Sequence, residues 1–370
     1  MVSTRLSLPM RSGKGCKYPL AVFIGRFQPF HNGHLLTLRQ ALDKAGHAVA
    51  IIGSAWHART LRNPFLTSEV ERMVRGGLTP DENARLSVRG VTDAYGDAAW
   101  IEAVHKAVAS VVDETGIQLN SEADICLTGY RKDETSTYLS LFPRWSFEET
   151  ENHQSINATD VRGSWLSDSG TDWLAMVPPA SEAVIREVGA SPAYAWLLEE
   201  RDERLARTGA EAGKSRTPLI YTCDGTVTQS GYIMLVTREK PPGKGLLSLP
   251  GGFLKPQETS RQTLVWNLVS DHGLMTNPRR SREDTAAMVD GRIVAMELFD
   301  HPWRSERGRA VSCSFLVELT PGTALEPLRR GPLGQAEWYP IARLDSLREK
   351  MFEDHAHIAR RMLSQSRWSS

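Results

Sequence analysis

Hydrophobic and polar positions follow two alternating patterns over the first half of the chain. Four short apolar runs are typical of buried strands and lie at 20–24, 48–52, 87–88 and 125–127. Apolar residues recur at helical spacing between 35 and 42. Strands separated by helices predict βαβ units and a parallel sheet, in which ligands bind at the carboxyl ends of the strands. We therefore predict an α/β domain here.

The pattern changes beyond residue 190. The charged stretch 193–207 predicts a linker helix, and apolar runs at 219–221 and 232–236 flank a turn at Gly231. A further strand-like run and an amphipathic closing helix follow, which together indicate an α+β domain. The predicted strand lies at 311–319 and the closing helix at 352–363. The predicted organisation is a disordered leader at 1–17, a first domain at 18–190, a linker helix at 191–216 and a second domain at 217–370.

Composition narrows the function classes. The 370 residues include 44 Lys plus Arg and 44 Asp plus Glu, so there is no basic field and we expect no nucleic acid partner. No apolar stretch is long enough to cross a bilayer, so we expect no membrane association. The four cysteines are far apart in the sequence, which argues against a zinc site or disulfide framework and favours the cytoplasm.

The segment from Gly25 to His34 carries the first candidate chemistry. It joins the apolar run 20–24 to the predicted helix at 35–42 and contains an arginine, two glycines and two histidines. Amide groups at a helix N-terminus bind anions, and glycine allows the backbone to approach a ligand closely. His31 and His34, three positions apart, can both donate to phosphate oxygens. This junction therefore predicts a phosphate site.

This segment resembles the signature of the nucleotidyltransferase superfamily that carries a His-x-Gly-His motif. Its form Gly-Arg-Phe-Gln-Pro-Phe-His resembles the archaeal-type nicotinamide-mononucleotide (NMN) adenylyltransferases. The resemblance implies a Rossmann-like fold and a reaction of NMN with ATP that yields NAD and pyrophosphate. It also implies Mg²⁺ as a cofactor accompanying ATP.

Four further blocks resemble that family and occur in its order. They are Arg59 to Phe65, Asp93 to Trp100, Thr128 to Trp145, and Asn157 to Arg162. We expect Thr67, Ser68 and Glu69 to cap the helix after the first block, and Thr159 to cap the helix in the last. In the family, an aromatic residue at the place of Trp100 stacks on the nicotinamide ring.

The resemblance implies roles for individual residues. The transition-state charge is assigned to His31, His34 and Arg162. ATP binding is assigned to Gly25, Arg26, Phe27, Gly33, Gly129, Lys132, Asp133, Asn157 and Thr159. NMN binding is assigned to Arg62, Asn63, Phe65 and Trp100.

The second half contains a segment similar to the Nudix box. Gly252, Glu258, Leu268, Gly273 and Leu274 match that pattern in register. The box's Arg-Glu pair is replaced by Trp266-Asn267, and its Glu-Glu pair by Ser270-Asp271. Glutamates there normally hold divalent metals, so only Glu258 and Asp271 remain as candidate ligands. We predict a retained Nudix fold, in an α+β domain, with lost or greatly weakened hydrolase activity.

Alternatives remain open from sequence alone. The first domain could use nicotinate mononucleotide or another acceptor, with an active ADP-ribose pyrophosphatase behind it. The chain could also be a nucleotide-sensing regulator. Trp303 and Arg304 could stack on and pair with ADP-ribose or NAD at the second domain, or that domain could be a scaffold. We expect a homo-oligomer.

Overall fold

The computed structural model describes residues 16–129, 141–150, 156–167, 170–211, 218–274, 281–321 and 335–366. The chain divides into two compact units. Unit 1 comprises Met1–Ala55 and Phe65–Gly189, and unit 2 comprises Trp56–Pro64 and Ala190–Ser370. Unit 2 therefore includes a short segment from the first half of the sequence, and it also includes the stretch that the sequence predicts to be a linker.

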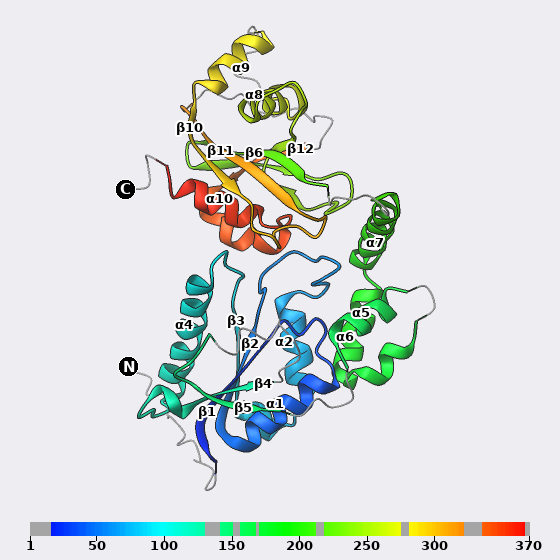
Figure 1. Cartoon of the computed structure of the whole chain (residues 1–370), viewed down its shortest axis with the longest axis vertical. Coiled ribbons are helices and arrows are strands. Elements are labelled where there is room, and N and C mark those ends of the chain that lie inside the picture. The colour runs from blue at the N-terminus through cyan, green and yellow to red at the C-terminus, as the bar shows by residue number, and fades with distance from the viewer. Residues whose placement is uncertain are drawn as a thin grey trace, which may run out of the picture. The chain divides into compact units, whose positions relative to one another are not determined.

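Unit 1 is built on a five-stranded sheet (Figure 1). All neighbouring strands are parallel, and their order is β3-β2-β1-β4-β5. The strands are β1 (Tyr18–Gly25), β2 (Ala45–Ile52), β3 (Leu86–Gly90), β4 (Ile125–Gly129) and β5 (Ser146–Glu149). The first four predicted strands are therefore confirmed. The order reverses direction between β1 and β4, and the crevice beyond their carboxyl ends is the usual ligand site of such sheets.

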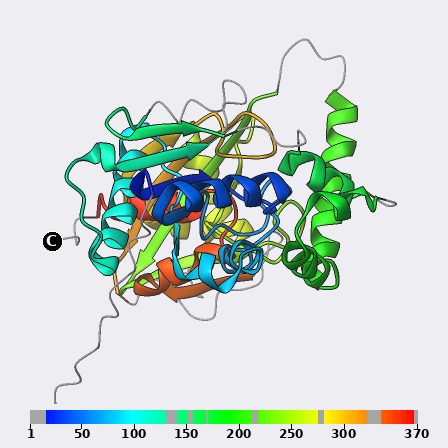
Figure 2. The same ribbon diagram turned by 90° about the horizontal axis from the view of Figure 1, so that it is seen from below.

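The helices of unit 1 connect and cover these strands. They are α1 (Asn32–Lys44), α2 (Thr67–Gly76), α3 (Pro80–Ala84), α4 (Asp97–Thr115), α5 (Ala158–Trp165) and α6 (Pro179–Gly189), with 3-10 turns η1 (Glu122–Asp124) and η3 (Asp172–Met176). Helix α1 packs on β1 and β2 (Figure 2). Val104, Val108 and Val111 of α4 join apolar strand residues in one core.

Unit 2 contains a mixed sheet of seven strands, with the order β10-β11-β6-β7-β12 and with β8 and β9 paired to β7 and β6. Its strands are β6 (Ile220–Gln229), β7 (Tyr232–Thr237), β8 (Leu247–Ser248), β9 (Gly251–Phe253), β10 (Ile293–Phe299), β11 (Ala310–Leu319) and β12 (Gln335–Pro340). Strands β6 and β11 are parallel, which joins two otherwise antiparallel parts. The predicted strands and the turn at Gly231 are present.

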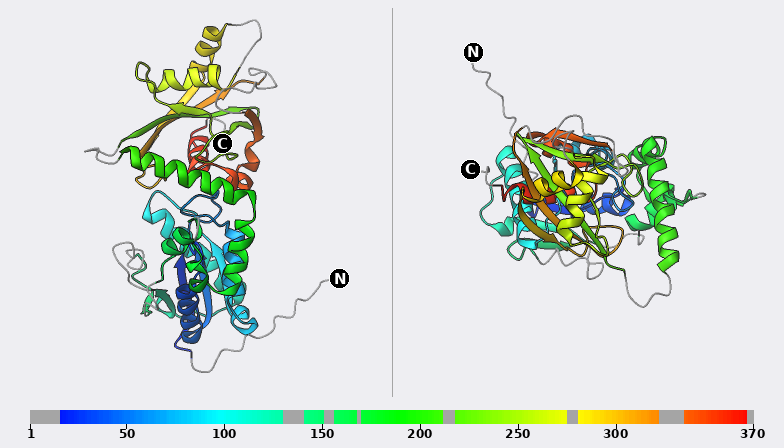
Figure 3. Two further views of the ribbon diagram at one scale, coloured as in Figure 1. Left: turned by 90° about the vertical axis from the view of Figure 1, so that its right-hand side faces the viewer. Right: turned by 90° about the horizontal axis from the view of Figure 1, so that it is seen from above.

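The helices of unit 2 are α7 (Pro192–Glu211), α8 (Ser260–Trp266), α9 (Arg282–Asp290) and α10 (His355–Leu363), with the π-helical turn η4 (Asn267–Asp271) and the 3-10 segment η5 (Ile341–Lys350). Helix α7 contacts the loop between β7 and β8 (Figure 3): the Glu200 carboxylate accepts a hydrogen bond from the Gly243 N–H, and Glu199 pairs with Lys244 at 3.1 Å. These contacts explain why α7 is part of unit 2.

Candidate active site

His31 and His34 form a reciprocal cap at the start of α1. The His31 Nδ1 accepts from the His34 N–H at 3.4 Å, and the His34 Nδ1 accepts from the His31 N–H at 3.3 Å. The two rings stack with centroids 3.6 Å apart. Because each Nδ1 acts as an acceptor, each neutral ring carries its proton on Nε2. The pair therefore presents two Nε2–H donors at a helix N-terminus.

Aromatic rings surround His34. Phe27 meets it edge-on at 5.0 Å between ring centroids, and Phe30 stacks on it at 5.7 Å. Burial lowers the pKa of His34 well below its ordinary value, and the adjacent His31 lowers it further. In the protein without nucleotide, His34 is therefore neutral near pH 7 and can still donate a hydrogen bond from its protonated ring nitrogen. A bound phosphate would raise its pKa.

Gly25 and Phe27 have a structural role beyond the predicted contact with ATP. A Cβ at Gly25 would lie 2.6 Å from the Phe27 ring. Phe27 is 1% exposed and has a positive φ of 53°. The Phe27 side chain is thus enclosed by protein, and a nucleotide would meet this residue only through its backbone.

Gln28 organises the site, although the sequence analysis assigned it no role. Its amide donates to the Phe65 carbonyl at 2.8 Å and accepts from the Phe65 N–H at 2.9 Å. Its own carbonyl accepts from the Arg162 Nη1 at 2.5 Å. Gln28 is 3% exposed. The sequence carries one signal for this role, because the Gln28 amide lies between aromatic residues that are expected to be buried. A buried amide needs several hydrogen-bond partners.

Helix α5 places Arg162 beside the histidine segment. Its N-cap is Asn157, whose Oδ1 accepts from the Asp160 N–H at 2.9 Å. The prediction that Thr159 caps this helix is wrong, because the cap lies two residues earlier, at Asn157, and Thr159 lies within the first turn. The Thr159 hydroxyl instead accepts from the Arg162 Nη2 at 3.2 Å.

The cap predicted for α2 also differs. Its N-cap is Leu66, and Glu69 accepts from the Leu66 N–H at 2.8 Å. Thr67 and Ser68 lie inside the helix rather than at its cap. A glutamate at the third helical position can thus satisfy an amide without a capping hydroxyl before it.

The predicted NMN residues fall into three settings. Trp100 is partly buried on α4 and lies 5.9 Å from the Phe142 ring. Phe65 is 3% exposed and stacks on Trp165 at 5.3 Å, so its ring belongs to the core of unit 1. Arg62 and Asn63 lie in the segment that groups with unit 2.

The remaining predicted ATP residues lie near strand ends. Arg26 is partly buried directly after β1, Gly33 lies in the first turn of α1, and Gly129 ends β4. Lys132 and Asp133 lie outside the described residues. In unit 1, His31 and His34 contact each other, and Arg162 contacts the carbonyl of Gln28, which lies three residues before His31.

The residues of the degenerate Nudix box in unit 2 form hydrogen bonds with one another. With its amide oriented to suit its neighbours, Asn267 donates to Asp271 at 2.9 Å and accepts from the Gly252 N–H at 3.2 Å. A Cβ at Gly252 would lie 2.8 Å from the end of the Asn267 amide that faces it. Gly273 has a positive φ of 67° and follows η4. The matching glycines therefore serve the fold, while an amide occupies a position that the Nudix pattern gives to a glutamate.

The predicted metal ligands, Glu258 and Asp271, each lie beside another polar side chain of unit 2. Asp271 is engaged by Asn267, and Glu258 lies 3.8 Å from the Lys255 ammonium. Throughout the described part of the chain, no group of three or more His, Cys, Asp or Glu side chains is placed to hold a metal. Hard divalent cations need several oxygen ligands, and the described residues do not bring such a group of side chains together.

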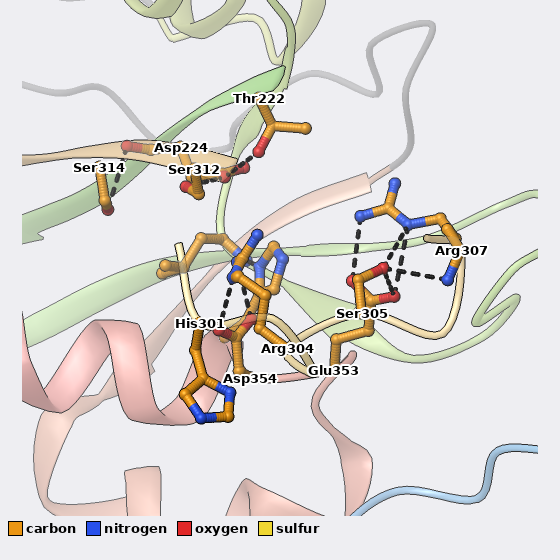
Figure 4. A network of polar contacts seen from close by, with 12 residues as sticks. Thr222, Asp224, His301, Arg304, Ser305, Arg307, Ser312, Ser314, Glu353 and Asp354 are labelled. Atoms are coloured by element: carbon orange, nitrogen blue, oxygen red, sulfur yellow. Dashed lines mark hydrogen bonds and ion pairs between the residues drawn. The ribbon is translucent and has the colours of Figure 1, made fainter. Parts of the chain in front are cut away.

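Arg304 does not have the ligand-pairing role predicted for it. Its guanidinium makes a bidentate ion pair with Asp354, at 2.9 and 2.8 Å, and its side chain is 1% exposed (Figure 4). Trp303, in contrast, is 76% exposed. Only the tryptophan of this predicted pair presents its side chain to solvent.

Comparisons with known proteins agree with this geometry. A cytidylyltransferase-like family model matches residues 22–163. A nicotinamide/nicotinic acid mononucleotide adenylyltransferase from Acinetobacter baylyi is 36% identical over 150 residues, which cover 40% of this chain and 76% of that protein. This chain belongs to the mononucleotide adenylyltransferase family. A nicotinamide-nucleotide adenylyltransferase from Thermococcus sibiricus is 47% identical over 175 residues, covering 45% of this chain and 83% of that one.

One solved structure resembles the whole chain of this family member. It is a bifunctional NMN adenylyltransferase/ADP ribose pyrophosphatase from Francisella tularensis, complexed with AMP and a manganese ion. It matches 94% of this chain and 99% of its own, with a TM-score of 0.79 and 24% identity. The predicted fold, a Rossmann-like domain followed by a Nudix-fold domain, is confirmed. The described residues include no helix that is both long and apolar enough to cross a bilayer.

Proposed function

We propose that this chain transfers the adenylyl group of ATP to NMN, forming NAD and pyrophosphate. Membership of the adenylyltransferase family supports the reaction class. The observation that carries the proposal is the stacked His31 and His34 pair at the start of α1, with Arg162 hydrogen-bonded to the same segment.

The chemistry suits this arrangement. A phosphate oxygen of NMN attacks the α-phosphorus of ATP, and the bond from that phosphorus to pyrophosphate breaks. Nucleophile and leaving group are both anionic, so the protein needs to align them and to stabilise charge rather than supply a general base. The two Nε2–H donors and the Arg162 guanidinium are the groups that we assign to that charge.

We propose Mg²⁺ as the divalent cation of the transferase. The segment from Gly25 to His34 contains no carboxylate. The ion would accordingly be carried by ATP phosphate oxygens, where it offsets their charge, while the histidines and arginine bind the remaining oxygens.

The transferase assay uses purified protein with ATP and NMN, and it measures NAD and pyrophosphate. We expect His34→Ala to lower kcat by about 10²-fold or more, because a preorganised donor to developing charge is removed. His301→Ala, in unit 2, is the control and should match the wild type. Near-normal turnover in His34→Ala would contradict the assigned role. Nicotinate mononucleotide in a parallel assay decides between the acid and amide substrates.

We further propose that unit 2 does not hydrolyse ADP-ribose at a significant rate. The amide of Asn267 and the hydroxyl of Ser270 stand where metal-binding glutamates are expected, and the described residues form no metal cluster. The test incubates the full chain with ADP-ribose and Mg²⁺ or Mn²⁺ and measures AMP. Fast release of AMP by the wild type, abolished in Glu258→Gln, would overturn this proposal.

A further inference from the structure

The turn from Thr60 to Asn63 has a defined conformation within unit 2. The Thr60 N–H donates to the Asn63 carbonyl at 3.1 Å, and the Asn63 N–H donates to the Thr60 Oγ1 at 3.0 Å. Arg59 donates from Nη1 to the Pro64 carbonyl at 2.7 Å. The side-chain oxygen of Asn63 is shielded from solvent and accepts no hydrogen bond from the described residues. The turn therefore presents an acceptor that the protein leaves unsatisfied.

Glu306 binds this turn from a distant part of the sequence. One carboxylate oxygen accepts from the Thr60 hydroxyl at 2.6 Å, and both oxygens lie 3.3 Å from the Arg62 backbone nitrogen, which donates to them. Hydrogen bonds to an ionised acceptor are stronger than neutral ones. Glu306 thus fixes the hydroxyl that closes the turn and the amide of a residue predicted to bind NMN.

The loop that carries Glu306 is itself held firmly. Arg304, two residues before it, pairs with Asp354, whose side chain is 10% exposed. Arg307, directly after it, pairs with Glu353 at 3.0 Å, and these side chains are 12% and 6% exposed. Figure 4 shows both pairs meeting this loop. One buried ion pair lies on each side of Glu306 in the sequence, and together they leave its backbone little freedom.

A small cavity lies beside the turn and Glu306. It has a volume of about 40 Å³ and is lined by Arg59, Thr60 and Leu61, by Glu200 and other α7 residues, and by Glu306. Close packing does not fill this space, so hydrogen bonds contribute more to the conformation of the turn than they would in a packed core.

We propose that Glu306 is a positioning residue for the mononucleotide: it holds the Thr60–Asn63 turn in the conformation in which Arg62 and Asn63 meet this substrate. This inference rests on the proposed function.

Steady-state kinetics test the inference. Glu306→Ala should raise KM for NMN about tenfold, as expected for the loss of a charge-assisted hydrogen bond that orders a binding turn, and should leave KM for ATP close to the wild-type value. Glu306→Gln, which keeps an acceptor, should show a smaller rise. The matched control is Asp300→Asn, an exposed carboxylate in the same loop, which should leave both constants unchanged. Equal rises in both KM values would contradict the inference.

A second measurement separates this inference from the proposed function. Hydrogen exchange of the peptide containing Thr60 to Asn63 should be faster in Glu306→Ala and in Thr60→Val, and the double variant should be no faster than either single one. Unchanged exchange would overturn the inference even if the enzyme makes NAD. A wild-type protein that makes no NAD would instead contradict the proposed function, and exchange would still decide the role of Glu306.

Discussion

At the scale of single residues, the segment from Gly25 to His34 depends on its internal packing. Gly25 is predicted from sequence as a backbone approach to ATP. The structure shows that it also makes room for the Phe27 ring, which in turn meets His34 edge-on. The glycine therefore supports the histidine through an intervening aromatic side chain.

Gly25→Ala tests this packing. The new Cβ would lie 2.6 Å from the Phe27 ring, and Phe27 cannot yield easily because it is buried with a positive φ. We expect a loss of about 1–3 kcal/mol in the free energy of unfolding, as for an overpacked core. Denaturant unfolding measures it. Gly96→Ala is the control, since a Cβ there meets nothing within 4 Å. Equal stabilities would contradict the account.

At the scale of elements, the start of α5 separates capping from nucleotide binding. The sequence analysis predicts Thr159 as the cap and assigns Asn157 to ATP binding only, although both are short polar residues suited to a cap. Only Asn157 has the extended backbone of an N-cap and accepts from an amide of the first turn. Thr159 is left with its hydroxyl beside Arg162.

Two variants test that division. Asn157→Ala should lower the free energy of unfolding by about 1 kcal/mol, because an N-cap is lost. Thr159→Val should leave stability nearly unchanged and raise KM for ATP, if Thr159 binds phosphate as predicted. Thermal unfolding and steady-state kinetics of both proteins supply the comparison. A larger stability loss in Thr159→Val than in Asn157→Ala would reverse the assignment.

Helix α8 and the turn after it keep the apolar register of the Nudix pattern but not its carboxylates. Thr259 caps it, with Gln262 completing the reciprocal pair, and Leu264 and Leu268 are fully buried. The π-helical turn after Trp266 carries Asn267 and Asp271, whose side chains bind each other. Apolar register maintains the fold, whereas metal binding depends on the carboxylates that have been replaced.

At the scale of the whole molecule, the two units carry buried groups with opposite responses to pH. In unit 1, burial lowers the pKa of His47 to about 4, helped by Arg85 and Arg89. In unit 2, burial raises the pKa of Glu200 to about 7, with Glu306 and Glu353 adding to the shift. Unfolding restores ordinary values near 6.5 and 4.5.

These shifts predict the sign of each contribution. Unfolded His47 takes up a proton that the folded form refuses, so its contribution to the stability of unit 1 falls as the pH drops from about 6.5 toward 4. Folded Glu200 retains a proton that the unfolded form releases, so its contribution to unit 2 falls as the pH rises from about 4.5 toward 7. Hydrogen exchange measured at a series of pH values reports the stability of each region. In His47→Gln, the protection of β2 peptides from exchange should fall less between pH 6.5 and 4 than in the wild type. In Glu200→Gln, the protection of β7 peptides from exchange should depend less on pH between 4.5 and 7, whereas the protection of β2 peptides should match the wild type. Identical pH profiles in wild type and variants would contradict both signs.

The sequence by itself determined what local patterns can encode. Apolar runs and helical spacing predicted the parallel sheet and the mixed second domain, and the segment from Gly25 to His34 predicted a phosphate site at the end of β1. The broken box was equally visible, because the loss of a carboxylate is a loss of charge at a known position. Periodicity and residue type are local properties, so a linear sequence exposes them.

Only the tertiary structure decided which residues meet. The structure shows that Asn157 rather than Thr159 caps α5 and that Arg304 pairs with Asp354. It also shows that Gln28 contacts both Phe65 and Arg162. It also grouped Trp56–Pro64 with unit 2 and brought Glu306 to Thr60, 246 positions away. Such partnerships depend on how buried polar groups satisfy one another after the chain has folded, and no local spacing specifies them.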